Sequence, residues 1–219
     1  MLTLALDAST YGGTVAVFRG AHLLATREVA MRGAHEERLM PAVAEALDEA
    51  GVRAEDLDRV VCGEGPGSFT SLRIAGSIAK GIAFARGIPL VPVSSLALVV
   101  GAAAPPLAAG EYVAALDALR DEAYVATCTV DDASQVVQVG PMRVIPNAEL
   151  ATLAARGARV AGPGHPFGGP PHARGVANMA AWLADRPPAD LAGWEPAYGR
   201  LAEAQVRWEA AHGRPLVAG

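Results

Sequence analysis

The residues of this sequence that could take part in chemistry gather in a few short segments. Asp7 is followed by two hydroxyl residues, Ser9 and Thr10, and then by Gly12-Gly13. A carboxylate at the end of a strand, beside hydroxyls and a tight glycine turn, could hold Mg²⁺ and a nucleotide phosphate. The alternative is an aspartate that caps the turn through its own backbone. The sequence therefore makes Asp7, Ser9 and Thr10 a candidate nucleotide site that competes with a purely structural turn.

A glycine-rich segment, Gly63-Glu64-Gly65-Pro66-Gly67-Ser68-Phe69-Thr70, joins an apolar run to a long apolar helix. Its glycines and proline fix an unusual backbone path, and Ser68 and Thr70 could cap the helix. The free N–H groups of the helix start could meet an anion or a partner carbonyl. The segment lacks the Lys-Ser/Thr pair of a phosphate-binding P-loop. A phosphate cradle and a turn without a ligand both stay open.

The histidines and cysteines do not have the spacing of a metal site. A metal pair on a helix needs a second histidine three or four residues after His35, where the sequence has Arg38 and Leu39. His165 and His172 lie in a Gly/Pro-rich segment, and the two cysteines stand alone, with Cys62 expected to be a buried apolar residue. We therefore expect no metal site.

Composition and charge exclude some classes of function. The chain has 219 residues, enough for one large domain or two small ones, and a net charge of -5. An acidic chain without a basic run is a poor primary binder of nucleic acid, because phosphate contacts need Lys and Arg. The start of the chain does not resemble a signal peptide, and four prolines interrupt the apolar run 89–109. We expect a cytoplasmic protein without a membrane span.

The apolar pattern predicts an α/β fold. Strands are expected over 2–7, 14–19, 22–30, 57–62 and 89–93, with helices over 36–50, 72–86 and from 94 onward. Pro41 should kink the first helix or mark a late start. Three strands joined by hairpins, followed by parallel crossovers, are typical of the ribonuclease H-like sheet that actin-type ATPases also use. This order predicts mixed sheets flanked by helices.

A Pro/Ala-rich stretch, 102–110, is a candidate linker. It divides the chain into an N-terminal ribonuclease H-like lobe, 1–101, and a smaller C-terminal lobe, 102–219. In the second lobe strands are expected over 112–116, 123–130 and 135–144, and helices over 146–155 and 176–184, with an irregular loop over 162–175. The Pro-rich tail from Arg186 should pack back on the body or on a partner.

The two long helices of the first lobe present unusual faces. Ile74, Ile78 and Ile82 form one ridge of the helix 72–86, and small residues (Ser71, Ala75, Ala79 and Ala83) form a second ridge beside it. The earlier helix places Leu39, Val43 and Leu47 on one face. Little of the later helix is polar, which is unusual for a solvent-facing layer. These helices either only cover the sheet or also form a protein–protein surface.

Several segments together resemble the TsaB (YeaZ) family, the accessory subunit of bacterial tRNA threonylcarbamoyladenosine synthesis. They are Leu4-Ala5-Leu6-Asp7-Ala8-Ser9-Thr10, His35-Glu36-Glu37-Arg38-Leu39-Met40-Pro41, the glycine-rich segment through Ile74, Ala79-Lys80-Gly81-Ile82-Ala83-Phe84, Val93-Ser94-Ser95-Leu96, Asp117-Ala118-Leu119-Arg120-Asp121-Glu122-Ala123-Tyr124 and Glu195-Pro196-Ala197-Tyr198. The resemblance implies an actin-like fold of two lobes and a degenerate nucleotide site at Asp7, Ser9 and Thr10. It also implies that this subunit performs no catalysis.

The family resemblance also implies partners. The catalytic subunit would be a TsaD-like protein, bound through the helix pair at His35, Leu39, Val43, Ser71, Ile74, Ala75, Ile78, Ala79 and Ile82. A TsaE-like ATPase would join the complex, the chain alone would form a homodimer, and tRNA would contact it only indirectly. No cofactor of its own is expected, with ATP and Mg²⁺ at most at a partner interface. The competing hypothesis is an active sugar or acyl kinase of the same fold.

Overall fold

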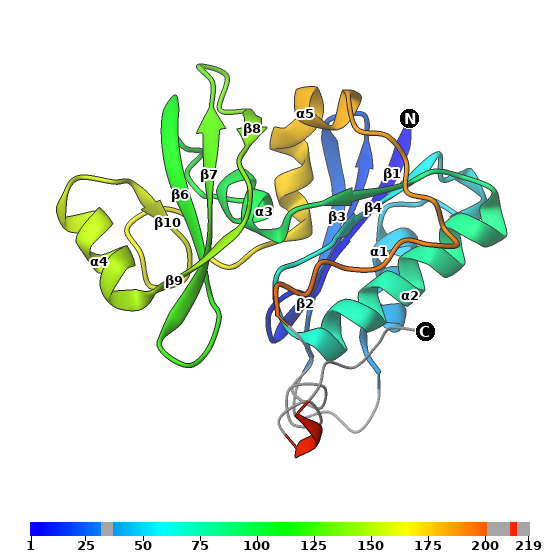
Figure 1. Ribbon diagram of the computed structural model, residues 1–219. Coiled ribbons are helices and arrows are strands. Elements are labelled where there is room, and N and C mark those ends of the chain that lie inside the picture. The colour runs from blue at the N-terminus through cyan, green and yellow to red at the C-terminus, as the bar shows by residue number, and fades with distance from the viewer. Residues whose placement is uncertain (32–36, 201–210, 214–219) are drawn as a thin grey trace.

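Two β-sheets stand side by side in the computed structural model, which describes residues 1–31, 37–200 and 211–213, and helices cover both sheets (Figure 1). The strands alternate with helices as the apolar pattern predicts, and the sheets are mixed. The fold is therefore the predicted actin-like, ribonuclease H-like α/β arrangement of two lobes. Among the described residues, no helix has the length and apolar character needed to cross a membrane.

The first sheet has the strand order β3-β2-β1-β4-β5. Its strands are β1 Leu2–Asp7, β2 Gly12–Arg19, β3 His22–Ala30, β4 Arg59–Gly63 and β5 Leu90–Val93. The first three strands pair antiparallel, whereas β4 and β5 run parallel to β1. The central strands read as nearly continuous apolar runs because both faces of the sheet are covered.

Helices α1 Leu39–Glu49 and α2 Phe69–Arg86 cover one face of this sheet, and α3 Ser95–Gly101 lies on the other. Helix α1 begins at Leu39, so Pro41 lies in its first turn, where a proline is tolerated because that N–H has no helical partner. The predicted late start is confirmed. A short 3₁₀ helix, η1 Ala54–Asp56, precedes β4.

The second sheet has the order β10-β6-β7-β8, and β9 also pairs with β7. Its strands are β6 Gly110–Asp117, β7 Glu122–Val130, β8 Val136–Val139, β9 Arg143–Pro146 and β10 Val160–Ala161. The prediction of one strand over 135–144 is wrong. Gly140 and Pro141 interrupt it, and β8 and β9 pair with opposite ends of β7.

Helix α4 Asn147–Ala155 covers the second sheet, and a 3₁₀ helix, η2 Ala173–Met179, continues into α5 Ala180–Ala184. The predicted irregular loop thus ends at Ala173, where η2 begins. The largest core cluster contains residues of both sheets together with α3, η2 and α5. These helices lie between the sheets (Figure 1) and join the two lobes through one apolar core.

The C-terminal tail packs back on the first lobe, as expected. The N–H of Ala189 donates to the carbonyl of Leu90 at 2.8 Å, and the N–H of Ala197 donates to the carbonyl of Glu64 at 2.7 Å. Lys80 Nζ donates to the carbonyl of Trp194 at 3.0 Å. The predicted division into 1–101 and 102–219 separates the two sheets, but this part of the tail contacts the first lobe.

Close approach of α3 and η2 gives a first prediction. A Cβ on Gly101 would lie 2.7 Å from the carbonyl oxygen of Gly175. Gly101→Ala is therefore expected to destabilise the chain by about 1–3 kcal/mol, because the backbones must move apart. Urea unfolding followed by circular dichroism measures this change.

Gly81→Ala is the matched control, since a Cβ there meets nothing within 4 Å. This exposed helix position is expected to gain about 0.5–1 kcal/mol from reduced chain entropy. Equal stability of the two variants would contradict the proposed role of the α3–η2 contact in joining the lobes.

Candidate functional site

Asp7 lies at the end of β1 and is fully buried. Its Oδ1 accepts hydrogen bonds from the backbone N–H of Ser9 at 3.1 Å and from Ser9 Oγ at 2.9 Å. Its Oδ2 accepts a bond from Ser95 Oγ at 2.5 Å, and Ser95 Oγ in turn accepts from the N–H of Gly65 at 3.1 Å. One carboxylate thus ties together β1, the glycine-rich loop and the start of α3.

The glycines of this loop are required by close contacts with the same network. A Cβ on Gly63 would lie 2.0 Å from Asp7 Oδ2, and one on Gly67 would lie 2.0 Å from the carbonyl oxygen of Ser9. That carbonyl also accepts the N–H of Ser68 at 2.7 Å. The loop therefore binds the chain's own backbone with the N–H group that a phosphate cradle would offer to a ligand.

These contacts concern the Asp7 part of the predicted nucleotide site, which stays a prediction. Both carboxylate oxygens of Asp7 already accept hydrogen bonds, and no part of the side chain reaches solvent. Asp7 in this geometry acts as a structural link and has no surface that a cation could reach from solvent. The predicted capping of α2 is wrong: Ser68 is the N-cap residue, but its hydroxyl pairs with Ser71 Oγ at 3.0 Å.

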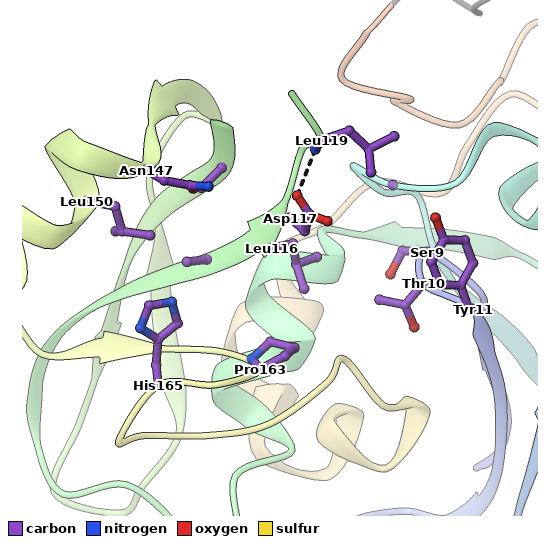
Figure 2. Close-up of a pocket in the computed structure, with 13 residues that line it drawn as sticks. Ser9, Thr10, Tyr11, Leu116, Asp117, Leu119, Asn147, Leu150, Pro163 and His165 are labelled. Carbon is purple, nitrogen blue, oxygen red and sulfur yellow. Dashed lines mark hydrogen bonds between the residues drawn. The ribbon is translucent and has the colours of Figure 1, made fainter. Parts of the chain in front are cut away.

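A cavity of about 420 Å³ opens between the two lobes, next to Ser9 and Thr10. Figure 2 shows Ser9, Thr10 and Tyr11 on one wall and residues of the second lobe on the opposite wall. The second-lobe residues include Leu116, Asp117, Leu119, Asn147, Leu150 and His165. Its volume falls in the range of small-molecule sites. The cavity lies where the nucleotide site is predicted, and nucleotide binding there stays a prediction.

The turn between β6 and β7 carries unusual backbone conformations at this cavity. Leu119, Arg120 and Asp121 all have positive φ, between 55° and 63°. Non-glycine residues rarely adopt this region, and each costs about 1–2 kcal/mol. Asp117 Oδ1 accepts the N–H of Leu119 at 2.8 Å, and Asp121 Oδ1 accepts from Asn147 Nδ2 at 3.1 Å. Both turn acids are thus engaged by hydrogen bonds, Asp117 within the turn and Asp121 with the first residue of α4.

The predicted partner surface on α1 and α2 requires a correction. Leu39, Val43, Ala75 and Ala79 are buried in the core against the first sheet, and Ser71 is also buried. These side chains hold the helices to their own sheet and offer no contact area to a partner. His35 lies outside the described residues.

Part of the apolar surface of α2 is covered by the chain itself. A Cβ on Gly76 would touch the side chains of Pro196 and Trp194, so the tail occupies that side of the helix. Phe69 packs on Tyr198 of the tail, with ring centroids 4.4 Å apart. The low polarity of α2 therefore has two causes, the sheet and the tail, before any partner is considered.

An apolar surface nevertheless remains on this helix. Ile74, Ile78 and Ile82 are only partly buried, and Phe84 is 80 % exposed. A shallow groove of about 570 Å³ lies along the first half of α2. Its lining residues are Glu37, Phe69, Thr70, Arg73, Ile74, Ser77 and Ile78. Met40 at the start of α1 is 45 % exposed. The sequence predicts Ile74, Ile78 and Ile82 as surface residues of α2 but not Phe69 and Phe84, because the exposure of a side chain cannot be read from helical spacing alone.

The remaining titratable residues do not assemble a metal site. Among residues 1–31, 37–200 and 211–213 no group of three or more His, Cys, Asp and Glu side chains could hold a metal ion. His165 lines the interlobe cavity, whereas His172 is buried and its Nε2 lies 3.0 Å from Glu28 Oε1. Cys62 is buried, as expected, and burial raises the pKa of its thiol.

The pH dependence of stability tests the Asp7 network. Burial raises the pKa of the Asp7 carboxyl, and the bonds from Ser95 and Ser9 offset only part of this effect. A group whose pKa is higher in the folded chain than in the unfolded chain stabilises the fold at pH values below its unfolded pKa. This stabilisation is lost as the pH rises through the folded-state pKa. Asp7→Asn cannot ionise, so its stability relative to the wild type is expected to increase from about pH 4 to about pH 7.

Asp56→Asn is a control of opposite sign, measured by the same urea unfolding series. The hydrogen bond from Arg53 lowers the pKa of Asp56 in the folded chain. The ionised Asp56 carboxylate therefore stabilises the fold at pH values above its unfolded pKa, and this stabilisation is lost as the pH falls. Asp56→Asn should therefore lose stability relative to the wild type as pH rises. A stability difference for Asp7→Asn that does not change with pH would show that the buried carboxyl does not titrate abnormally.

Comparison with known proteins identifies relatives of this chain. A family model described as "TsaD: tRNA N6-adenosine threonylcarbamoyltransferase" matches residues 28–169, more than half of the chain. The chain is 37% identical over 121 residues to the tRNA threonylcarbamoyladenosine biosynthesis protein TsaB of Haemophilus influenzae, covering 55% of this chain and 51% of the relative. It is 33% identical over 132 residues to the Escherichia coli TsaB, covering 60% and 57%. In these alignments the chain spans about half the length of the curated relatives it matches.

Solved structures extend the similarity over nearly the whole chain. YeaZ from Pseudomonas aeruginosa superposes with a TM-score of 0.74 and 30% identity, covering 90% of this chain and 99% of that one. A second Pseudomonas aeruginosa structure, described as an uncharacterized protein with similarity to peptidase YeaZ, superposes with a TM-score of 0.75 and 31% identity, covering 91% and 99%. On sequence and structure together, the chain belongs to the TsaB (YeaZ) family.

Proposed function

We propose that this chain is a non-catalytic subunit of tRNA threonylcarbamoyladenosine synthesis that binds and activates a TsaD-like catalytic subunit. The relatives are named as biosynthesis proteins of this modification, which supports a role in the pathway. The observation that carries the binding role is the apolar groove on α2 with the exposed aromatic side chains beside it. The catalytic subunit would transfer the threonylcarbamoyl group to tRNA adenosine next to the anticodon.

The contact with the catalytic subunit would use the solvent-exposed side chains of α1 and α2. Met40 on α1 and Phe69, Ile74 and Ile78 on α2 supply apolar area, while Arg73 lies over the Phe69 ring at 5.3 Å from its centroid. Aromatic, methionine and arginine residues are the types enriched at protein interfaces. Helices α1 and α2 lie side by side on one face of the first sheet (Figure 1), so the partner meets a ready-made helix pair.

A rigid base supports this surface. The α2 helix starts from the loop that Asp7 and Ser95 fix to β1, and its buried ridge packs on the sheet. The tail holds its other side through Trp194 and Pro196. A pre-ordered face costs less conformational entropy on binding than a mobile one. The same rigidity suits a subunit whose proposed task is to hold an enzyme in its active shape.

Absence of catalysis by this subunit is proposed from the Asp7 geometry. A kinase of this fold, the competing hypothesis, needs a carboxylate that reaches Mg²⁺, but the two oxygens of Asp7 face Ser9 and Ser95 in a dry interior. ATP and Mg²⁺ are then expected at most at an interface with a partner. A TsaE-like ATPase as a further subunit, and indirect contact with tRNA by an acidic chain of net charge -5, belong to the same proposal.

Without its partner the chain would form a homodimer. A two-fold interface places the same surface of each copy against the other, so a homodimer would cover the α2 groove of both copies at once. We also propose a cytoplasmic location, because the relatives are named as proteins of tRNA threonylcarbamoyladenosine biosynthesis.

A charged substitution in the groove tests the partner surface. Ile78→Asp is expected to weaken binding of the TsaD-like subunit of the same organism by at least tenfold, because the carboxylate would be buried without a partner. Ile78 is only partly buried in the free chain, so the variant should still fold. Isothermal titration calorimetry of the two purified subunits measures the loss.

Val137→Asp, at a partly exposed apolar residue of β8 in the other lobe, is the matched control and should bind as the wild type does. Equal binding by both variants would contradict the placement of the interface, and failure of the wild-type chain to bind would contradict the proposed function.

Nucleotide turnover tests the non-catalytic assignment. The purified chain alone is expected to release phosphate from ATP no faster than buffer, because Asp7 is not free to hold Mg²⁺. A malachite-green phosphate assay with Mg²⁺ present makes the measurement. Turnover that Thr10→Ala abolishes would instead support a kinase-like enzyme that works in the interlobe cavity.

A further inference from the structure

A second cavity lies at the far end of the first sheet, away from the α2 groove and the interlobe cavity. It encloses about 560 Å³ between the sheet and the η2–α5 helices. Its walls are mainly apolar side chains, among them Phe18, Val91, Val176, Ala177, Leu183 and Pro188. A concave apolar space of this size is typical of small-molecule sites.

Arg59 projects a cation into this apolar space. As the first residue of β4 it shares the sheet face of Val61, which looks toward η2 and α5. Its Nε donates to Thr3 Oγ1 at 2.9 Å. Within residues 1–31, 37–200 and 211–213 its two terminal nitrogens make no hydrogen bond or ion pair. Burial lowers the pKa of the guanidinium, and no acid is close enough to raise it.

The other charged groups of the cavity do not neutralise Arg59. Asp58 also lines the cavity, but its Oδ2 accepts the backbone N–H of Leu2 at 2.6 Å and lies 3.8 Å from the N-terminal amino group of Met1, and its side chain is half exposed. Arg186 stacks over the Trp182 ring at 3.7 Å from its centroid. Its charge also acts on the carboxyl group of Glu64, which does not line the cavity. The charged groups that line the cavity are the N-terminus, Arg59 and Arg186 on the positive side and Asp58 on the negative side, so positive groups outnumber negative ones.

We propose that this cavity binds a small amphipathic anion, with a carboxylate or phosphate head on Arg59 and an apolar body against Phe18, Val91 and Leu183. Arginine suits such a head because its planar fork donates two parallel hydrogen bonds to one carboxylate or phosphate. The apolar wall takes the body of the ligand out of water, which stabilises the complex in proportion to the area buried. This inference goes beyond the proposed function and requires neither the partner subunit nor tRNA.

Octanoate is the first probe, compared with 1-octanol, which lacks the charge, and with inorganic phosphate, which lacks the apolar body. Titration of the full chain, followed by nuclear magnetic resonance of its backbone amides, should show saturable shifts at 176–184 and 59–61 with octanoate. Each control compound should bind at least about tenfold more weakly, because it keeps only one of the two contacts. Absence of saturable octanoate binding, or equal binding of all three probes, would overturn the proposal.

Two pairs of variants place the binding in this cavity. Arg59→Gln keeps an amide that can donate to Thr3 and should weaken octanoate binding at least about tenfold. Arg53→Gln, an exposed arginine paired with Glu55 and Asp56, should leave it unchanged. Ala184→Phe places a ring in the cavity and should block octanoate, whereas Ala181→Phe on the same helix does not line it and should not. Wild-type affinity in both Arg59→Gln and Ala184→Phe would overturn the proposal, and each variant is first checked for native circular dichroism.

Discussion

The buried carboxylate of Asp7 is the constraint on which the rest of this structure depends. It joins the end of β1 to the glycine-rich loop and to α3, and a Cβ on Gly63 of that loop would collide with it, whereas a Cβ on Gly67 would collide with the Ser9 carbonyl. Loss of this link would release the start of α2 from the sheet. Hydrogen bonds from Ser9 and Ser95 offset part of the cost of burying this carboxyl group, and its pKa is raised by the burial.

Two kinds of surface follow from this arrangement. One side of α2 is fixed to the sheet by its small residues, and another is covered by the tail at Trp194 and Pro196. The strip that remains, around Ile78 and Phe84, is the part of the helix that a partner can still reach. On the opposite face, η2 and α5 pack on both sheets and leave the cavity next to Arg59. The docking surface and the cavity are therefore separated by the first sheet.

Sequence reasoning predicted much of this fold, because strands β1 and β3 and the helices of the first lobe follow strong apolar patterns and glycine or proline boundaries. The sequence-based prediction failed where contacts between residues far apart in the chain determine the structure. The break between β8 and β9 depends on where each pairs along β7. The burial of Leu39 and Ala79 could not be separated from partner contact by helical spacing. Asn147 and His165 reach the interlobe cavity only through the tertiary fold.

The most direct test of the central claim is hydrogen–deuterium exchange of this chain with and without the TsaD-like subunit. The proposed docking surface predicts new protection in α1 and along α2, at 39–49 and 69–86, with little change in β6, β7 and α4. Slower exchange confined to the residues around the interlobe cavity would contradict it. In that case the chain would meet its partner through the cleft between the lobes, and the exposed face of α2 would need another explanation.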